Sequence, residues 1–438
     1  MGNLGKTFLF ASVSLLVVLW GGIYSPALSG DPHSAYYSSK NDRIFWFVQI
    51  SDIHIGARET EDIQPTQNLQ WIVTDAKTII DPEFIVASGD LTDSTNGNFL
   101  PIPDGPYQKE WDDYRAILER AGMDSSFYYD IPGNHDAYND KDFDYYLANS
   151  VQGQATGLTQ ISWTREFDFG KYHFLGTNTA GNTGEGFSVF KPYGDPAGLD
   201  EGELSFIHDE LEANQDADLT LIFGHHPLYD TGVSTDTWLF YGQTEFVDYM
   251  DSYGASLYGY GHTHRFSEDI FSGNSYTGFM QGDGVYYFNI ASLGKSSENQ
   301  YSIIAVDCNG ISIVTQDVRT WPVVLITAPL GKDLGATANP YVYDVPNSSR
   351  NPIRALVFDP NEIAGVHYRI DGSGIWHPMS PVSGNPHLWE ALWNASTLTK
   401  GEHTVEVQAA SASGIRTDLI TVQVMPSTFI PSLLLLLL

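Results

Sequence analysis

The stretch Ile44-Phe45-Trp46-Phe47-Val48-Gln49-Ile50-Ser51-Asp52-Ile53-His54 decides the fold of this chain. Its first seven residues are apolar except for Gln49, and such a run of β-branched and aromatic residues is typical of a buried strand. Asp52 and His54 follow directly, and residues two apart in an extended loop point to the same side. The strand is therefore expected to end in two side chains that can reach one ion.

The same alternation of apolar strands and polar loops continues to about Val318. Further strands are predicted over Phe84–Ser88, Phe127–Ile131, Tyr172–Gly176, Leu219–Phe223 and Ser256–Tyr260, and helices over Gln67–Ile80, Gln108–Ala121 and Asp200–Ala213. Three more strands follow, over Val285–Ala291, Tyr301–Val306 and Ile311–Val318, with an Asn309-Gly310 hairpin turn between the last two. Alternating strands and helices predict an α/β domain.

The pattern changes after Trp321-Pro322, where short strands and turns replace the strand–helix alternation. The predicted strands are Val323–Thr327, Ile353–Phe358, Gly365–Ile370, Leu388–Leu392, His403–Ala409 and Leu419–Val424. Strands at this spacing predict a β-sandwich of about 100 residues.

Residues that can bind metals follow five of the predicted strands, at the ends where open α/β sheets place their sites. The clusters are Ser51-Asp52-Ile53-His54, Gly89-Asp90-Leu91-Thr92-Asp93, Pro132-Gly133-Asn134-His135-Asp136, Gly224-His225-His226-Pro227 and Gly261-His262-Thr263-His264. Each cluster alone has an ordinary explanation as a turn, a loop or a capped strand end. Together they predict a metal site, because five ligand-rich clusters at five strand ends rarely arise by chance.

The residue types favour a centre for two divalent cations. Asp and neutral imidazole suit Mn, Fe or Zn, and the choice among these metals stays open. A carboxylate such as Asp90 can bridge two ions through its two oxygens. Two ions ~3.5–4 Å apart can clamp a phosphate and turn a bridging water into hydroxide for in-line attack. The leaving alkoxide then needs a proton, which a histidine that is not a ligand can supply.

The five clusters, in this order, resemble the motifs of the calcineurin-like metallophosphoesterases over about residues 43–318. The resemblance implies a four-layer α/β fold, in which helices flank two central β-sheets, and a dimetal centre at the strand ends. It also implies the roles of individual residues. A first metal would be held by Asp52, His54 and His264, a second by Asn134, His225 and His262, and Asp90 would bridge the two. His135 would be the general acid or transition-state stabiliser, and Asp93 would orient it by a hydrogen bond. His226 then fits better beside the ligands than among them. Purple acid phosphatases carry a tyrosine ligand at the position of Asp93, so a tyrosinate–ferric centre is not expected.

A narrower resemblance extends beyond the catalytic region. The stretch Trp321–Thr327, followed by Ile353–Leu356 and Ile370–Gly372, resembles the transmembrane protein 62 family. That resemblance implies an immunoglobulin-like sandwich after the phosphoesterase domain. The expected division is a signal peptide or anchor over 1–30, the phosphoesterase domain over 41–320, the sandwich over 321–425 and a hydrophobic tail over 426–438. A protein partner of the sandwich cannot be read from the sequence.

The charge balance excludes some partners. Acidic residues outnumber basic ones by 54 to 21, which gives a formal net charge of −33. Such a chain repels nucleic-acid backbones and anionic membrane surfaces, so a nucleic-acid polymer is not expected as a partner. A phosphate-ester substrate stays compatible, because bound metal cations reverse the local field. The single cysteine, Cys308, excludes an internal disulfide framework and a Cys-based zinc module.

Both ends of the chain are apolar. The run Phe8–Trp20 behind Lys6, followed by the small residues Ala27 and Ser29, predicts a secretory signal, with an uncleaved anchor as the alternative. The catalytic domain is therefore expected to be extracellular or lumenal, in a secreted or a membrane-anchored protein. The terminal run from Phe429 to Leu438 is far shorter than the ~20 residues that span a membrane. A truncated membrane helix or a short membrane-proximal tail is favoured, and a lipid-anchor signal stays open.

Two functions of different classes fit these observations. The first is an exported dimetal phosphoesterase that cleaves a phosphomonoester or a phosphodiester. The second is an extracellular or lumenal binding or scaffold ectodomain whose metal site is not catalytic. His135 separates them, because it is not needed to hold metal, and an intact Asp93–His135 pair favours catalysis.

Overall fold

The computed structural model describes residues 36, 43–98, 103–181, 197–228, 238–264, 285–296, 299–332 and 344–425. The predicted signal or anchor over 1–30 and the tail over 426–438 lie outside these residues. Among the helices of the described ranges, none is long and apolar enough to cross a membrane.

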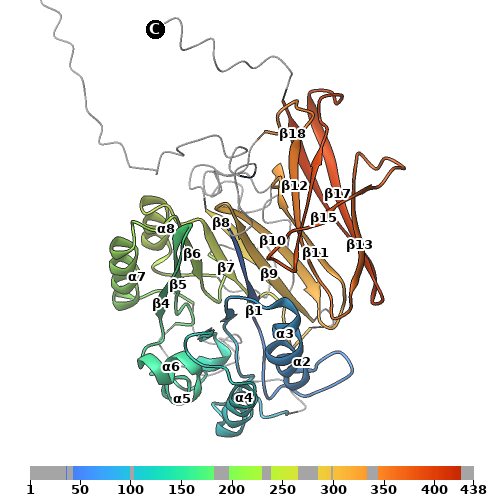
Figure 1. Cartoon of the computed structure of the whole chain (residues 1–438). Coiled ribbons are helices and arrows are strands. Elements are labelled where there is room, and N and C mark those ends of the chain that lie inside the picture. Colours follow the sequence, from blue (N-terminus) through green and yellow to red (C-terminus); the bar gives the residue numbers. More distant parts are fainter. Residues whose placement is uncertain are drawn as a thin grey trace, which may run out of the picture.

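Two five-stranded sheets form the centre of the α/β region (Figure 1). The first has the order β10-β9-β1-β2-β3 and contains β1 (Ile44–Ile50), β2 (Ile85–Ser88), β3 (Tyr128–Ile131), β9 (Gln300–Asp307) and β10 (Gly310–Asp317). The second runs β4-β5-β6-β7-β8 and contains β4 (Ile161–Phe167), β5 (Gly170–Gly176), β6 (Leu219–Phe223), β7 (Leu257–Tyr260) and β8 (Tyr286–Asn289). Both sheets are mixed: β1–β3 and β5–β8 are parallel, and β4, β9 and β10 pair antiparallel.

The two sheets face each other across an aromatic core. Phe47 of β1 stacks on Phe84 with ring centroids 4.6 Å apart, and it meets Phe174 of β5 and Phe223 of β6 edge to face. These rings are completely buried. Because this core fixes one sheet against the other, the parallel strands of both sheets end at one common edge.

Helices cover the outer faces of both sheets. The first sheet is covered by α2 (Pro65–Trp71), the π-helical turn η1 (Ile72–Ala76), α3 (Lys77–Ile80), α4 (Gln108–Arg120), α5 (Asp144–Asn149) and α6 (Val151–Thr156). The second is covered by α7 (Glu201–Ala213) and α8 (Gln243–Ser252), as Figure 1 shows. The layers therefore run helix, sheet, sheet, helix, as the family resemblance implied.

The structure departs from the expected elements in three places. The helix predicted over Gln67–Ile80 begins at Pro65, whose missing N–H costs no hydrogen bond in a first turn, and its middle turn is π-helical. The strand predicted near residues 285–291 is β8, which joins the second sheet, whereas β9 and β10 return to the first. Finally, the sequence did not predict three helices, α5, α6 and α8, or strand β4. The apolar residues that α8 buries are Phe246 and Met250, which are too few for a clear helical period.

The last part of the described chain is a β-sandwich of two four-stranded antiparallel sheets (Figure 1). One sheet contains β11 (Val323–Ala328), β12 (Asn351–Phe358), β15 (Ser380–Pro381) and β16 (Leu388–Trp393), and the other contains β13 (Ile363–Ile370), β14 (His377–Pro378), β17 (Gly401–Ser411) and β18 (Gly414–Val424). Valine, isoleucine and alanine side chains from both sheets fill the space between them.

The sandwich packs tightly on the α/β region. All of β12 is buried, because one of its faces points into the sandwich while Leu356 and Phe358 join the core around β1 and the helices. Arg354 makes a two-pronged ion pair with Asp307 at the end of β9, with Nε and Nη2 at 2.9 and 3.1 Å from the carboxylate oxygens. Thr327 donates to the same carboxylate at 2.7 Å. A buried charged contact therefore joins the two parts.

Candidate metal centre

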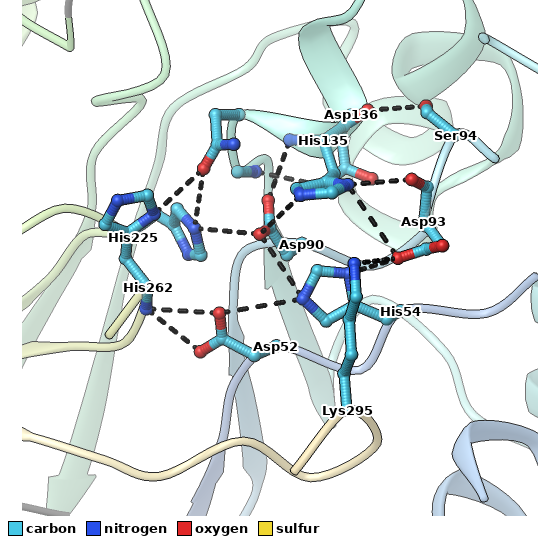
Figure 2. A network of polar contacts seen from close by, with 12 residues as sticks. Asp52, His54, Asp90, Asp93, Ser94, His135, Asp136, His225, His262 and Lys295 are labelled. Carbon is cyan, nitrogen blue, oxygen red and sulfur yellow. Dashed lines mark hydrogen bonds and ion pairs between the residues drawn. The ribbon is translucent and has the colours of Figure 1, made fainter. Parts of the chain in front are cut away.

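The five ligand-rich clusters meet at the common edge of the two sheets (Figure 2). The loops after β1, β2 and β3 come from the first sheet, and the loops after β6 and β7 come from the second. Their backbones hydrogen-bond directly: the amide of Asp52 donates to the carbonyl of Gly89 at 3.0 Å, and that of His54 donates to Asp90 at 2.9 Å. The structure therefore brings together every residue that the resemblance placed in the centre, which are Asp52, His54, Asp90, Asp93, Asn134, His135, His225, His262 and His264.

Glycines let these loops approach each other. A Cβ atom on Gly133 would lie 2.2 Å from the amide nitrogen of Asp90, and one on Gly261 would lie 1.9 Å from the Ser51 hydroxyl oxygen. Real Cβ atoms do not come this close, so the Gly-Asn and Gly-His pairs of the motifs are required by packing as well as by ligand chemistry.

The backbone of the site is held in a left-handed conformation at several non-glycine residues. Asp52, His54, Asp90, His262 and His264 have φ between 51° and 70°. The extended loop expected at Asp52 and His54 is therefore wrong, although the two side chains still converge. Left-handed backbone costs about 1–3 kcal/mol per residue, and its concentration here is typical of a functional site.

One group of ligand atoms surrounds the first candidate position. His54 Nε2 lies 3.0 Å from His264 Nε2 and 3.6 Å from Asp90 Oδ2. Asp52 Oδ1 lies 3.2 Å from His264 Nε2. Two imidazole nitrogens and two carboxylates therefore point at one small volume, and the donor set suits a borderline divalent cation.

A second group adjoins the first and shares Asp90. Asn134 Oδ1 lies 3.2 Å from His225 Nε2 and 3.0 Å from His262 Nδ1. His225 Nε2 is also 3.2 Å from Asp90 Oδ2. The expected bridge used both oxygens of Asp90, but here Oδ2 faces both groups while Oδ1 accepts the backbone N–H of His135 at 2.8 Å.

The protonation states agree with a metal site. Burial alone would raise the pKa of the Asp52 and Asp90 carboxyls, but the neighbouring histidines hold both pKa values below their usual range. Burial lowers the pKa of His54 and that of His262 to about 3, which keeps both rings neutral. Although burial opposes it, the charge of Asp90 helps to raise the pKa of His225 to about 9, so this ring must give up a proton to a binding metal.

His135 and Asp93 are arranged differently from the expectation. His135 Nδ1 donates to the backbone carbonyl of Asp93 at 2.7 Å, while the Asp93 carboxylate is 3.9 Å away. The backbone of Asp93, and not its side chain, orients His135. The Asp93 carboxylate instead lies 2.9 Å from Nδ1 of His54 and 2.5 Å from Nζ of Lys295 (Figure 2).

His226 adjoins the second group: a ring nitrogen of it lies within 4.8 Å of those of His225 and His262, so these three could also hold a metal ion. That His226 stands beside the ligands and not among them stays a prediction. Its side chain is buried, its Nδ1 is 3.1 Å from the hydroxyl of Thr179, and its ring centroid is 4.5 Å from that of His262. The Thr179 hydroxyl also accepts the backbone amides of His225 and His226. His226 therefore helps to hold the loop after β6.

Sequence reasoning missed three residues that support the site. Asp136 accepts the backbone amides of Leu91, Thr92 and Gly133 at 2.9–3.0 Å, which ties the loop after β2 to the loop after β3. Glu110 of α4 accepts amides of the loop after Asp93. Lys295 follows β8. Of these three residues, only Asp136 belongs to one of the sequence motifs. Glu110 and Lys295 lie near the site only because of the tertiary structure.

Comparison with known proteins agrees with this geometry. A family model described as calcineurin-like phosphoesterase matches residues 45–266. The chain is 28% identical over 395 residues to transmembrane protein 62 of Mus musculus, covering 89% of this chain and 56% of the relative. It is 26% identical over 373 residues to an Arabidopsis thaliana protein named "Putative metallophosphoesterase", covering 75% of this chain and 48% of the relative. The chain thus spans about half the length of these curated relatives.

Among solved structures, the purple acid phosphatase PPD1 from yellow lupin seeds covers 63% of this chain and 52% of its own. The sequence identity is 13% and the TM-score is 0.40.

Proposed function

This chain belongs to the calcineurin-like phosphoesterase family, and we propose that it is a metal-dependent hydrolase that cleaves a phosphomonoester or a phosphodiester at the centre around Asp90. The observation that carries the proposal is the position of Asp90 Oδ2, which lies 3.2 Å from His225 Nε2 and 3.6 Å from His54 Nε2. One carboxylate oxygen thus faces both groups of ligand atoms.

The residues present fit two divalent metals. Asp52 and Asp90 are buried carboxylates among imidazoles, of which His54 and His262 stay neutral, so the site keeps a negative charge that a cation would balance even while the His225 ring is protonated. We propose that Asp52, His54 and His264 hold one metal, that Asn134, His225 and His262 hold the other, and that Asp90 contacts both. When bound, such metals polarise the phosphate and lower the pKa of water.

His135 is the proposed proton donor to the leaving alkoxide. Its Nδ1–H is held by the carbonyl of Asp93, which leaves Nε2 as the atom that carries the mobile proton. Burial lowers the pKa of His135, so the protonated ring gives up its proton more readily. The side chain is 13% exposed, which leaves it open to a substrate at the mouth of the centre.

Further proposals concern the rest of the chain. We infer that residues 41–320 and 321–425 are separate domains, that the sandwich is immunoglobulin-like, and that the protein is exported or membrane-anchored with the catalytic domain extracellular or lumenal. The apolar run Phe8–Trp20 supports export. The net charge of −33 favours a small phosphate ester over a nucleic-acid polymer.

The test is turnover of a chromogenic phosphomonoester and of a phosphodiester by the full chain reconstituted with Mn²⁺. We expect Asp90→Asn to lower kcat by about 10³-fold or more, because both metal positions lose a ligand. His135→Ala should lower kcat by about 10²–10⁴-fold while the metal content is unchanged. His377→Ala, at an exposed position of the sandwich, is the matched control and should keep full activity.

If wild type binds two metals but turns over neither ester above the Asp90→Asn background, hydrolysis of simple esters is wrong. A binding ectodomain with a non-catalytic metal site would then be the better account.

A further inference from the structure

We propose that Lys295 is a positioning residue of the metal centre, which holds the Asp93 carboxylate against His54 and thereby fixes the ring of a metal ligand. This inference rests on the proposed function. Lys295 lies outside residues 45–266, which the family model matches.

Both carboxylate oxygens of Asp93 contact other side chains. Oδ1 lies 2.5 Å from Nζ of Lys295 and 2.9 Å from Nδ1 of His54. Oδ2 accepts the hydroxyl of Thr95 in a short hydrogen bond. The carboxylate is almost completely buried, whereas Lys295 is 19% exposed, so the lysine approaches Asp93 from the rim of the centre (Figure 2).

The contact between Asp93 and His54 determines which ring nitrogen of His54 is free to bind a metal. A carboxylate beside Nδ1 keeps the ring proton on that nitrogen and leaves the lone pair of Nε2 for a metal. In the structure, His54 Nε2 points toward Asp90 Oδ2 at 3.6 Å and toward Asp52 Oδ1 at 3.9 Å. Without the lysine, the carboxylate would lose its strongest partner and could turn toward His135, 3.9 Å away.

The loop that carries Lys295 is built onto the loop that carries the ligands. The backbone amide of Leu293 donates to the carbonyl of Ser51 at 2.9 Å, and that of Gly294 donates to Asp52 at 3.1 Å. The hydroxyl of Ser292 donates to the same carbonyl of Asp52 at 2.8 Å. A Cβ on Gly294 would lie 1.9 Å from the carbonyl oxygen of Ile53, so glycine is required for this approach. The backbone next to Lys295 is therefore tied to the loop after β1.

Two effects of the lysine on metal binding have opposite signs. A positive charge near the site repels a cation, so its removal would tighten binding if repulsion were its main effect. If the lysine acts by positioning Asp93, its removal weakens binding. Whether metal binding tightens or weakens when Lys295 is removed therefore distinguishes charge repulsion from positioning of Asp93.

The experiment is a double-mutant cycle on Mn²⁺ affinity, measured by titration calorimetry on the full chain, with Lys295→Met, Asp93→Asn and the double variant. Asp93→Asn should weaken the affected Mn²⁺ site by about 10–100-fold, as removal of such supporting partners does. Lys295→Met should weaken it less, by roughly 3–10-fold. The double variant should match Asp93→Asn alone, because the lysine acts through Asp93. Lys295→Arg should restore most of the affinity.

The matched control is Lys171→Met. Lys171 also pairs with a carboxylate, Asp216 at 2.6 Å, and is 24% exposed, but it stands at the start of β5, away from the centre. Its removal should leave Mn²⁺ affinity unchanged.

Tighter Mn²⁺ binding by Lys295→Met, or losses that add in the double variant, would overturn the inference. A rise in KM with unchanged Mn²⁺ affinity would also overturn it, and would make Lys295 a substrate contact. If wild type itself bound no Mn²⁺, the proposed function would fail instead, so the two failures can be told apart.

Discussion

At the strand ends of the α/β region, Asp52, Asp90 and Asp93 are buried within a few ångström of one another, and Lys295 pairs with only one of them. In the sandwich, the buried charged side chains of the described chain are Arg354, Glu406 and His403, and each has an opposite charge beside it. The sandwich balances its charges within the protein. In the strand-end cluster, Lys295 and the protonated ring of His225 face three carboxylates, which leaves an excess of negative charge that bound metal would balance.

The first test of this contrast removes the positive charge of a buried ion pair of the sandwich. Arg354→Met leaves Asp307 buried without its cation, so the free energy of unfolding should fall by about 3–5 kcal/mol. Denaturant unfolding measures this change. Adding Asp307→Asn should recover part of the loss, because no buried charge is then left unpaired.

The control for that variant is Lys332→Met. Lys332 pairs with Glu402, and their side chains are 34% and 60% exposed, so its loss should cost no more than about 1 kcal/mol. Equal losses in the Arg354 and Lys332 variants would contradict the view that burial of the charged pair is what matters.

The second test concerns how closely the loops pack. Gly133→Ala places a Cβ 2.2 Å from the backbone of Asp90, so the loops must separate and Mn²⁺ affinity should fall by about 10–100-fold, or 1.4–2.7 kcal/mol. A Cβ added at Gly374 in the sandwich would meet no atom within 4 Å, so Gly374→Ala should change neither metal affinity nor stability. Calorimetric titration of the two variants side by side gives the comparison, and an unaffected Gly133→Ala would refute it.

The third and smallest effect is a pH dependence of the sandwich. Both ring nitrogens of His403 face acceptors, Asp371 Oδ2 at 2.7 Å and the carbonyl of Thr399 at 2.8 Å. Burial lowers the pKa of this ring, but the Asp371 and Thr399 contacts outweigh burial and raise it above the usual value of 6.5. The protonated ring therefore stabilises the folded chain.

Because the folded-state pKa lies above the unfolded one, this stabilisation is complete below pH 6.5 and is lost as pH rises through the folded-state pKa. We expect a loss of less than about 1 kcal/mol, given the exposed carboxylate. Thermal unfolding at several pH values measures it, and His403→Gln should flatten the profile. A wild-type profile that matches that of His403→Gln across this range would show that folding does not raise the pKa of His403.

Much of the α/β region could be predicted because most of its strands are mainly apolar, as in Ile44–Ile50, and five of them end at a ligand-rich cluster. The short helices α5, α6 and α8 could not, since each buries too few apolar residues to set a clear period. They are held in place by packing against the sheets.

The ligand types and their order along the chain were determined by the sequence alone, because aspartate, asparagine and histidine after buried strands carry their chemistry wherever the strands lie. Which atoms meet was decided by the tertiary structure. The left-handed backbone at Asp52 and His54 and the contact of the Asp93 carboxylate with His54 depend on how the loops after β1 and β2 meet. The position of Lys295, which follows β8, depends on two sheets packed face to face. No spacing along the chain encodes contacts between residues more than 200 positions apart; only the packing of the aromatic core between the sheets fixes them.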